Sequence, residues 1–111
     1  MELRPSKPFT DMTEAAIKKL PGQLGVYQIA DAQGTIVKIG FAGGRAPFGL
    51  RSELLKELEA LGAGHRFRVE VNMQYTTRYQ ELLMLHQADF GALPRENAKD
   101  PPPRLGHLSP R

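Results

Sequence analysis

The stretch Leu24–Gly40, LGVYQIADAQGTIVKIG, decides the fold. Residues 24–30 and 35–40 are rich in β-branched and apolar side chains, and the tetrapeptide DAQG at 31–34 between them is composed of residues that favour a turn. A turn between two such runs predicts a β-hairpin. The rest of the chain must therefore supply the elements that extend and cover this hairpin.

The segments around the hairpin alternate between helix and strand periodicities. Leucines recur at helical spacing over 50–61, and apolar residues alternate strictly with polar ones over 66–74. A second long helix is expected over about 76–90, and a short helix with a capping box that begins at Asp11 precedes the hairpin. The strand residues expected to be buried are Phe67, Val69, Val71 and Met73. This order predicts an α/β fold with a small three-stranded, mostly antiparallel sheet flanked by helices.

Length and composition narrow the class of protein. A chain of 111 residues holds one domain. The absence of cysteine excludes disulfides, thiolate nucleophiles and Cys-ligated zinc. No apolar run approaches the roughly 18 residues that a membrane span needs, and the first residues lack the apolar centre of a signal peptide. We therefore expect a cytoplasmic protein without a membrane partner.

The ends of the chain differ in composition from its middle. We expect a flexible head over 1–9, a folded domain over 10–97, and a proline-rich, basic and disordered tail over 98–111. The formal net charge is +3, and residues 94–111 carry four basic and two acidic residues. Since two of the three excess charges lie there, the body is nearly balanced, which permits a polyanionic partner without requiring one.

Four side chains are candidates for chemistry at one site. Tyr27 and Lys38 fall near one another across the predicted hairpin, where cross-strand β-carbons lie roughly 5 Å apart. Arg51 opens the next helix, where backbone N–H groups also favour an anion, and an Arg can grip a phosphate with two hydrogen bonds. Glu81 is the acidic residue in an otherwise apolar helical stretch, and a buried carboxylate needs a partner such as a divalent cation.

Two spaced tripeptides connect these residues to a known family. Gly-Val-Tyr at 25–27 is followed by ten residues and then by Lys-Ile-Gly at 38–40, with Arg51, Glu81 and Asn97 further along the chain. This pattern resembles the GIY-YIG nuclease domain. The resemblance implies a three-stranded sheet flanked by helices that hydrolyses DNA phosphodiester bonds with the help of one Mg²⁺ or Mn²⁺ ion.

The resemblance covers about residues 22–97 and implies a role for each matched residue. Tyr27 is expected to be the base that activates water, and Arg51 a clamp on the scissile phosphate. Glu81 is expected to be the metal ligand and Asn97 a support near the site.

One departure from the family pattern concerns the second tripeptide. Lys38 stands where the family usually has Tyr. A Lys ammonium near Tyr27 would favour the phenolate and lower a pKa that is ordinarily about 10. We therefore expect Lys38 to assist Tyr27 or to hold phosphate directly.

Two further departures leave the clamp and the metal ligand open. The glycine-rich segment before Arg51 is longer than is common in the family, which makes Arg45 a rival for the phosphate. Some members of this family are DNA-repair enzymes. Aligning the apolar run at 82–85 with the run that precedes the metal-binding Glu in those enzymes makes His86 a rival of Glu81, although imidazole suits magnesium poorly.

The partner is expected to be DNA, in contact with Arg66 and Arg68 on the wet face of the third strand. Neither the head nor the tail is large enough to be a separate recognition domain. Specificity would then come from DNA structure, from a second copy of the chain in a homodimer, or from another protein.

Less specific interpretations compete with each role. The chain can be a nucleic-acid-binding module that kept the fold and lost turnover, or a protein-interaction domain whose proline-rich tail binds a partner. Glu81 can simply pair with Arg78 or Arg66. His86, on an apolar stripe, can be a satisfied core histidine.

Overall fold

Four strands form one antiparallel sheet, in the order β1-β4-β2-β3, in the part of the chain that the computed structural model describes, residue 5 and residues 7–99. The strands are β1 (Thr10–Asp11), β2 (Gly25–Ala30), β3 (Ile36–Ala42) and β4 (Arg66–Val71). The helices are α1 (Glu14–Lys18), α2 (Leu50–Leu61), α3 (Tyr75–Phe90) and α4 (Arg95–Lys99). The predicted tail lies almost wholly outside the described residues, as does most of the predicted head.

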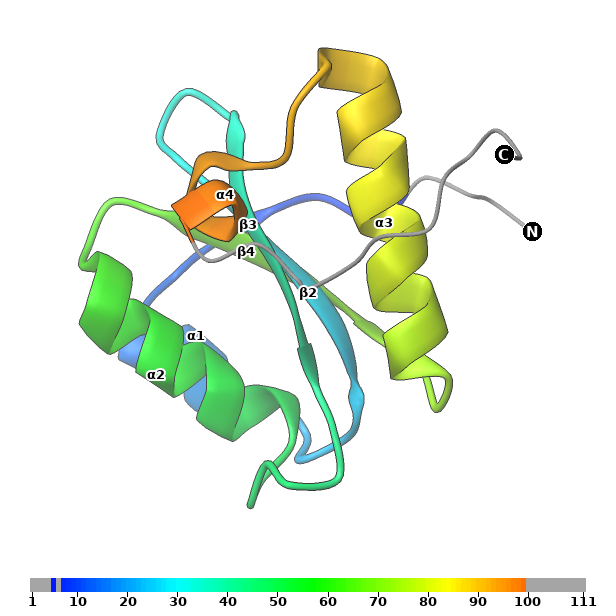
Figure 1. Ribbon diagram of the computed structural model, residues 1–111. Helices are drawn as coiled ribbons and strands as arrows, with labels where there is room; N and C mark the ends of the chain where they lie inside the picture. The colour runs from blue at the N-terminus through cyan, green and yellow to red at the C-terminus, as the bar shows by residue number, and fades with distance from the viewer. Residues whose placement is uncertain (1–4, 6, 100–111) are drawn as a thin grey trace.

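The helices cover both faces of the sheet (Figure 1). On one face, α1 and α2 enclose a core that contains Tyr27, Ile29 and Leu54. On the other face, α3 packs against Val26 and Ile39 through Leu82 and Leu83. The predicted α/β class and antiparallel sheet are thus confirmed. None of the helices in the described residues is long and apolar enough to cross a membrane.

The predicted strand count was wrong by one. Thr10 and Asp11 pair with Phe67 and Arg66 and so add β1 to the free edge of β4. A two-residue strand is too short to show an alternating pattern, so no periodicity predicted it.

Two local predictions were also wrong. The first helix is capped by Thr13, whose hydroxyl accepts a hydrogen bond from the Ala16 N–H at 3.1 Å, because Asp11 is already part of β1. The buried face of β4 stops short of Val71 and Met73, which are exposed; the strand ends at Val71, and Met73 is 76% exposed in the turn before α3.

The hairpin forms where it was predicted. The Asp31 N–H donates to the Thr35 carbonyl at 2.9 Å, and the Asp31 carboxylate accepts hydrogen bonds from the N–H groups of Gln33 and Thr35, both at 3.0 Å. The side chain of Asp31 therefore fixes the turn that joins β2 to β3.

The glycines of the two tripeptides are required by close packing. A β-carbon at Gly40 would lie 2.3 Å from the ring of Tyr27, the residue directly opposite on β2. A β-carbon at Gly25 would lie 2.2 Å from the backbone carbonyl oxygen of Glu70 on β4. The phenol of Tyr27 thus lies across the backbone of β3 in a space that only glycine leaves open.

We expect Gly40→Ala to lower the free energy of unfolding by about 1–3 kcal/mol, because the added methyl group overlaps the Tyr27 ring. Gly44→Ala is the matched control: a β-carbon there meets no atom within 4 Å, so the change should stay within about 0.5 kcal/mol. Urea denaturation of both variants measures the difference, and equal stability would show that Tyr27 does not lie over Gly40.

Candidate functional site

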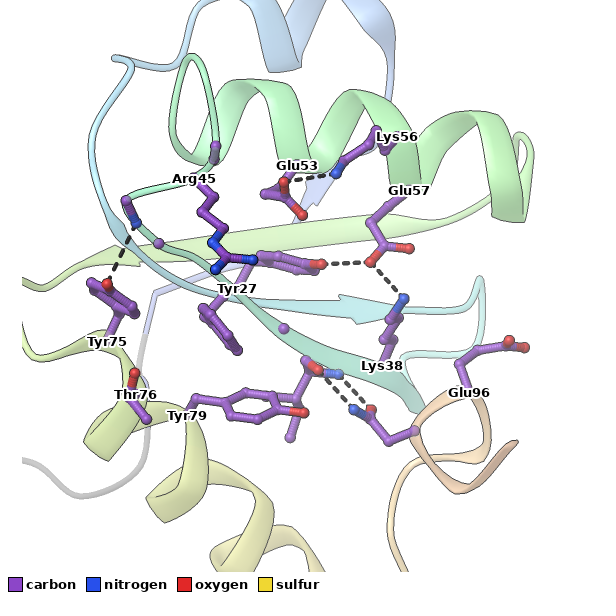
Figure 2. Close-up of a pocket in the computed structure, with 17 residues that line it drawn as sticks. Tyr27, Lys38, Arg45, Glu53, Lys56, Glu57, Tyr75, Thr76, Tyr79 and Glu96 are labelled. Carbon is purple, nitrogen blue, oxygen red and sulfur yellow. Dashed lines mark hydrogen bonds and ion pairs between the residues drawn. The ribbon is translucent and has the colours of Figure 1, made fainter. Parts of the chain in front are cut away.

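An open pocket of about 700 Å³ lies beside β3, the edge strand of the sheet (Figure 2). Its walls come from β3 and the loop that follows, from α2, from the first turns of α3 and from α4. Four of the residues singled out in the sequence line this pocket: Tyr27, Lys38, Arg45 and Asn97. The structure thus brings Tyr27 of the first tripeptide and all of the second tripeptide to one concave surface.

Tyr27 and Lys38 meet through a third residue, Glu57 of α2. The Tyr27 hydroxyl donates a hydrogen bond of 2.5 Å to Glu57 Oε2, and Lys38 Nζ lies 2.6 Å from the same oxygen. Glu57 is only 7% exposed. Both partners are needed there, because an unpaired carboxylate is costly to bury.

Glu57 reverses the expected effect on Tyr27. Burial raises the pKa of the Tyr27 hydroxyl far above its ordinary value of 10, and the Glu57 charge and hydrogen bond raise it further. Lys38 was expected to favour the phenolate, but its ammonium pairs with Glu57 instead. Tyr27 is therefore a neutral hydrogen-bond donor, and the Glu57 carboxylate is its acceptor.

Glu57 was missed in the sequence, although a signal was available. Leu50, Leu54, Glu57 and Leu61 follow one another at spacings of four, three and four residues, which places them on one face of a helix. An acidic residue on an apolar face is a reason to look for a buried partner.

Asn97 joins α4 to the outer edge of β3. Its side-chain amide accepts a hydrogen bond from the Ile39 N–H and donates one to the Ile39 carbonyl, both at 2.8 Å. Asn97 is buried, and its amide satisfies both backbone groups of Ile39. This paired contact fixes the pocket wall that α4 provides.

The other acidic side chains at the pocket form ion pairs with residues other than Arg45. The Glu53 carboxylate pairs with Lys56 at 2.9 Å, and that of Glu96 with Lys99 at 3.1 Å. Arg45 is exposed in the loop after β3 and has no ion-pair partner among the described residues. An exposed, unneutralised guanidinium at the mouth is suited to hold an anion.

Arg51 does not reach this pocket. Its Nε donates a hydrogen bond of 3.0 Å to the Leu20 carbonyl, and its guanidinium lies 6.0 Å from the centre of the Phe48 ring. The first turn of α2 directs the side chain toward the segment after α1, away from Tyr27. Of the two predicted phosphate clamps, the structure places only Arg45 at the pocket.

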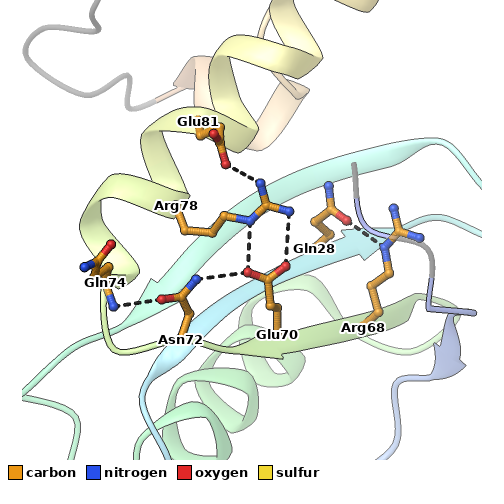
Figure 3. Close-up of polar contacts among 7 residues, drawn as sticks. All are labelled: Gln28, Arg68, Glu70, Asn72, Gln74, Arg78 and Glu81. Atoms are coloured by element: carbon orange, nitrogen blue, oxygen red, sulfur yellow. Dashed lines mark hydrogen bonds and ion pairs between the residues drawn. The ribbon is translucent and has the colours of Figure 1, made fainter. Parts of the chain in front are cut away.

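Glu81 also lies elsewhere, in a cluster beside α3 (Figure 3). Its carboxylate accepts a hydrogen bond from Arg78, whose guanidinium also donates to Glu70 at 2.9 and 3.1 Å. Burial alone would raise the pKa of Glu70, but the hydrogen bonds from Arg78 and Asn72 outweigh it and lower that pKa. The simpler interpretation, a pair between Glu81 and Arg78, is confirmed.

Three other predicted residues also lie outside the pocket. His86 Nδ1 is 2.9 Å from the Ala92 carbonyl, in a separate hollow of about 400 Å³ near the end of α3. Arg66 lies 3.7 Å from Asp11. Arg68 donates to the Gln28 side chain at 2.6 Å, on the sheet face opposite Tyr27.

Neither of the two predicted metal ligands lines the pocket that contains Tyr27. Glu81 and His86 lie apart from Tyr27, and the Glu81 carboxylate is held by Arg78. Within the described residues, no group of three or more His, Cys, Asp or Glu side chains is placed to hold an ion. The carboxylate expected to hold a Mg²⁺ or Mn²⁺ ion is thus paired with Arg78 in this structure.

Comparison with known proteins places the chain in a family. Residues 1–89 match the family described as Domain of unknown function (DUF7508). The chain belongs to the DUF7508 family. The DUF7508 match includes Tyr27, Lys38, Arg45 and Glu57 but ends before Asn97. No curated protein and no solved structure matches the chain.

We expect Tyr27 to remain protonated near pH 10, the ordinary pKa of tyrosine, because burial and Glu57 both disfavour the phenolate. In Glu57→Gln the pKa of Tyr27 should fall but stay above its ordinary value, since burial persists. The measurement is tyrosinate absorbance against pH, with Tyr27→Phe subtracted and Glu59→Gln, an exposed change on the same helix, as control. Ionisation of Tyr27 below pH 10 in the unmodified protein would contradict this geometry.

Proposed function

We propose that this chain is a nucleic-acid-binding module of GIY-YIG-like fold that holds a DNA strand at the pocket beside β3. The observation that carries the proposal is Arg45, exposed at the pocket and unpaired among the described residues, while Glu53, Glu57 and Glu96 each have a basic partner. A guanidinium binds a phosphate with two parallel hydrogen bonds. Arg45 therefore supplies the strand contact.

Gly40 and Asn97, two further residues of the family pattern, have roles in holding the fold together, and this favours DNA binding over catalysis. Gly40 leaves room for the Tyr27 ring, and Asn97 holds the backbone of Ile39. Two residues that the nuclease resemblance implies for the reaction, Arg51 and Glu81, lie outside the pocket. Binding through Arg45 requires neither of them.

We expect salt-sensitive DNA binding, measured by fluorescence anisotropy with a labelled oligonucleotide. Arg45→Ala should weaken binding and reduce the slope of log affinity against log salt by about 0.7–0.9, the contribution of one phosphate contact. Arg66→Ala is the matched control, because it removes the same charge from a residue that does not line the pocket. Salt-independent binding by the unmodified protein, or equal losses in the two variants, would count against the proposal.

A second candidate function, DNA endonuclease, is favoured by one observation, the cluster of Tyr27, Glu57 and Lys38. A buried carboxylate with two donors at 2.5 and 2.6 Å is a fixed proton acceptor on the pocket wall. In this candidate, Glu57 takes the proton of the attacking water and Arg45 stabilises the negative charge that develops on the phosphoryl oxygens. Tyr27 holds the carboxylate in position.

If the chain cuts DNA, Glu57→Gln should reduce the rate by at least about 100-fold, because it removes the proton acceptor. Glu81→Gln is the control and should leave the rate unchanged. Nicking of supercoiled plasmid in Mg²⁺ or Mn²⁺ measures both. No cleavage by the unmodified protein would reject the endonuclease candidate, and loss of cleavage only in Glu81→Gln would transfer the carboxylate role to Glu81.

A further inference from the structure

Phe41 is an exposed aromatic side chain on the wall of the proposed DNA-binding pocket. It is 38% exposed, whereas its neighbours Gly40 and Ala42 on β3 are buried. Burying an aromatic side chain completely would stabilise the fold by about 1.5–3 kcal/mol. An exposed ring on a strand gives up part of that stabilisation. The ring lines the same pocket as Arg45.

Two tyrosines from the start of α3 hold the Phe41 ring in place. Tyr75 stacks on it with ring centres 5.6 Å apart and an interplanar angle of 20°. Tyr79 meets it at 62°, with ring centres 5.0 Å apart. Tyr75 and Tyr79, which also line the pocket, project toward it from α3 (Figure 2). Phe41 and these two tyrosines form what we call the aromatic wall.

The aromatic wall is connected to the loop that carries Arg45. The Gly44 N–H donates a long hydrogen bond of 3.4 Å to the Tyr75 hydroxyl. A β-carbon at Gly43 would lie 2.9 Å from the Tyr75 ring, so this loop passes directly against the wall. The loop that carries Arg45 therefore passes next to rings that can stack a base, and both line the same pocket.

We propose that the aromatic wall stacks an unpaired nucleobase while Arg45 holds a neighbouring phosphate, so that the ligand is single-stranded DNA. This inference rests on the proposed binding function and names its substrate class. In a duplex the base faces are covered by adjacent bases, whereas single strands offer them to aromatic side chains. A phosphate alone gains nothing from an exposed phenylalanine, so the wall indicates recognition of the base as well.

The test compares three labelled DNA probes of equal length by fluorescence anisotropy: a single-stranded oligothymidine, an oligomer with the same sugar-phosphate backbone but no bases, and a duplex. We expect oligothymidine to bind about 5- to 150-fold more tightly than the base-free oligomer, which is the range for stacking one base. The duplex should also bind more weakly than oligothymidine. Equal affinity for oligothymidine and the base-free oligomer, or tighter binding of the duplex, would overturn the inference.

Matched variants separate base stacking from phosphate binding. Phe41→Leu keeps an apolar side chain and should weaken binding of oligothymidine but not of the base-free oligomer. Arg45→Ala should weaken binding of both. Phe90→Leu, an equally conservative change at an exposed ring outside the pocket, should affect neither. Circular dichroism confirms that each variant is folded; if Phe41→Leu is not, Tyr79→Leu tests the same wall.

The outcomes distinguish the inference from the function on which it rests. If oligothymidine and the base-free oligomer bind equally, and Arg45→Ala weakens both, the binding function stands and the aromatic wall has no role in it. If no probe binds, the proposed function and the inference both fail. A loss of oligothymidine binding in Phe90→Leu as large as in Phe41→Leu would also reject the wall as the stacking site.

Discussion

The buried carboxylate of Glu57 is the contact on which the arrangement of the pocket depends. It joins α2 to both strands of the hairpin, because its Oε2 atom is shared by Tyr27 of β2 and Lys38 of β3. A charge in such a position is tolerated only when its hydrogen-bond partners are held around it. Burial and this contact together raise the pKa of Tyr27, and the same contact pairs Lys38 with an internal carboxylate.

The sheet separates two clusters of charge with different roles. Glu57 and its partners line the open pocket on the α2 side. On the α3 side, Arg78 is buried between Glu70 and Glu81 and connects that helix to β4 through Glu70. The resemblance to the GIY-YIG family implied a single site that contains Tyr27 from one cluster and Glu81 from the other. The sheet separates these residues, because Tyr27 lies on the face covered by α2 and Glu81 lies on α3, which covers the other face.

The sequence was most informative for features that depend on a local pattern, although the helix cap and the buried face of β4 were exceptions. The turn at Asp31, the helix over 50–61 and the spaced tripeptides all depend on neighbours within one or two elements, and they predicted the hairpin and the meeting of Tyr27 with Lys38. The direction of the Arg51 side chain and the pairing of β1 depend on distant residues, Leu20 and Phe67, which no local pattern reveals. Glu57 lies between these cases, because its place on an apolar helix face was visible but its partners were not.

The contact between Asn97 and Ile39 has a consequence for association between molecules. An edge strand offers unpaired backbone groups to any other extended chain, and exposed edges of this kind promote aggregation. By bonding to both backbone groups of Ile39, the amide of Asn97 takes the place of a further strand at the middle of β3. The DUF7508 match ends at residue 89. The residue that blocks strand pairing at this edge therefore lies beyond the matched segment.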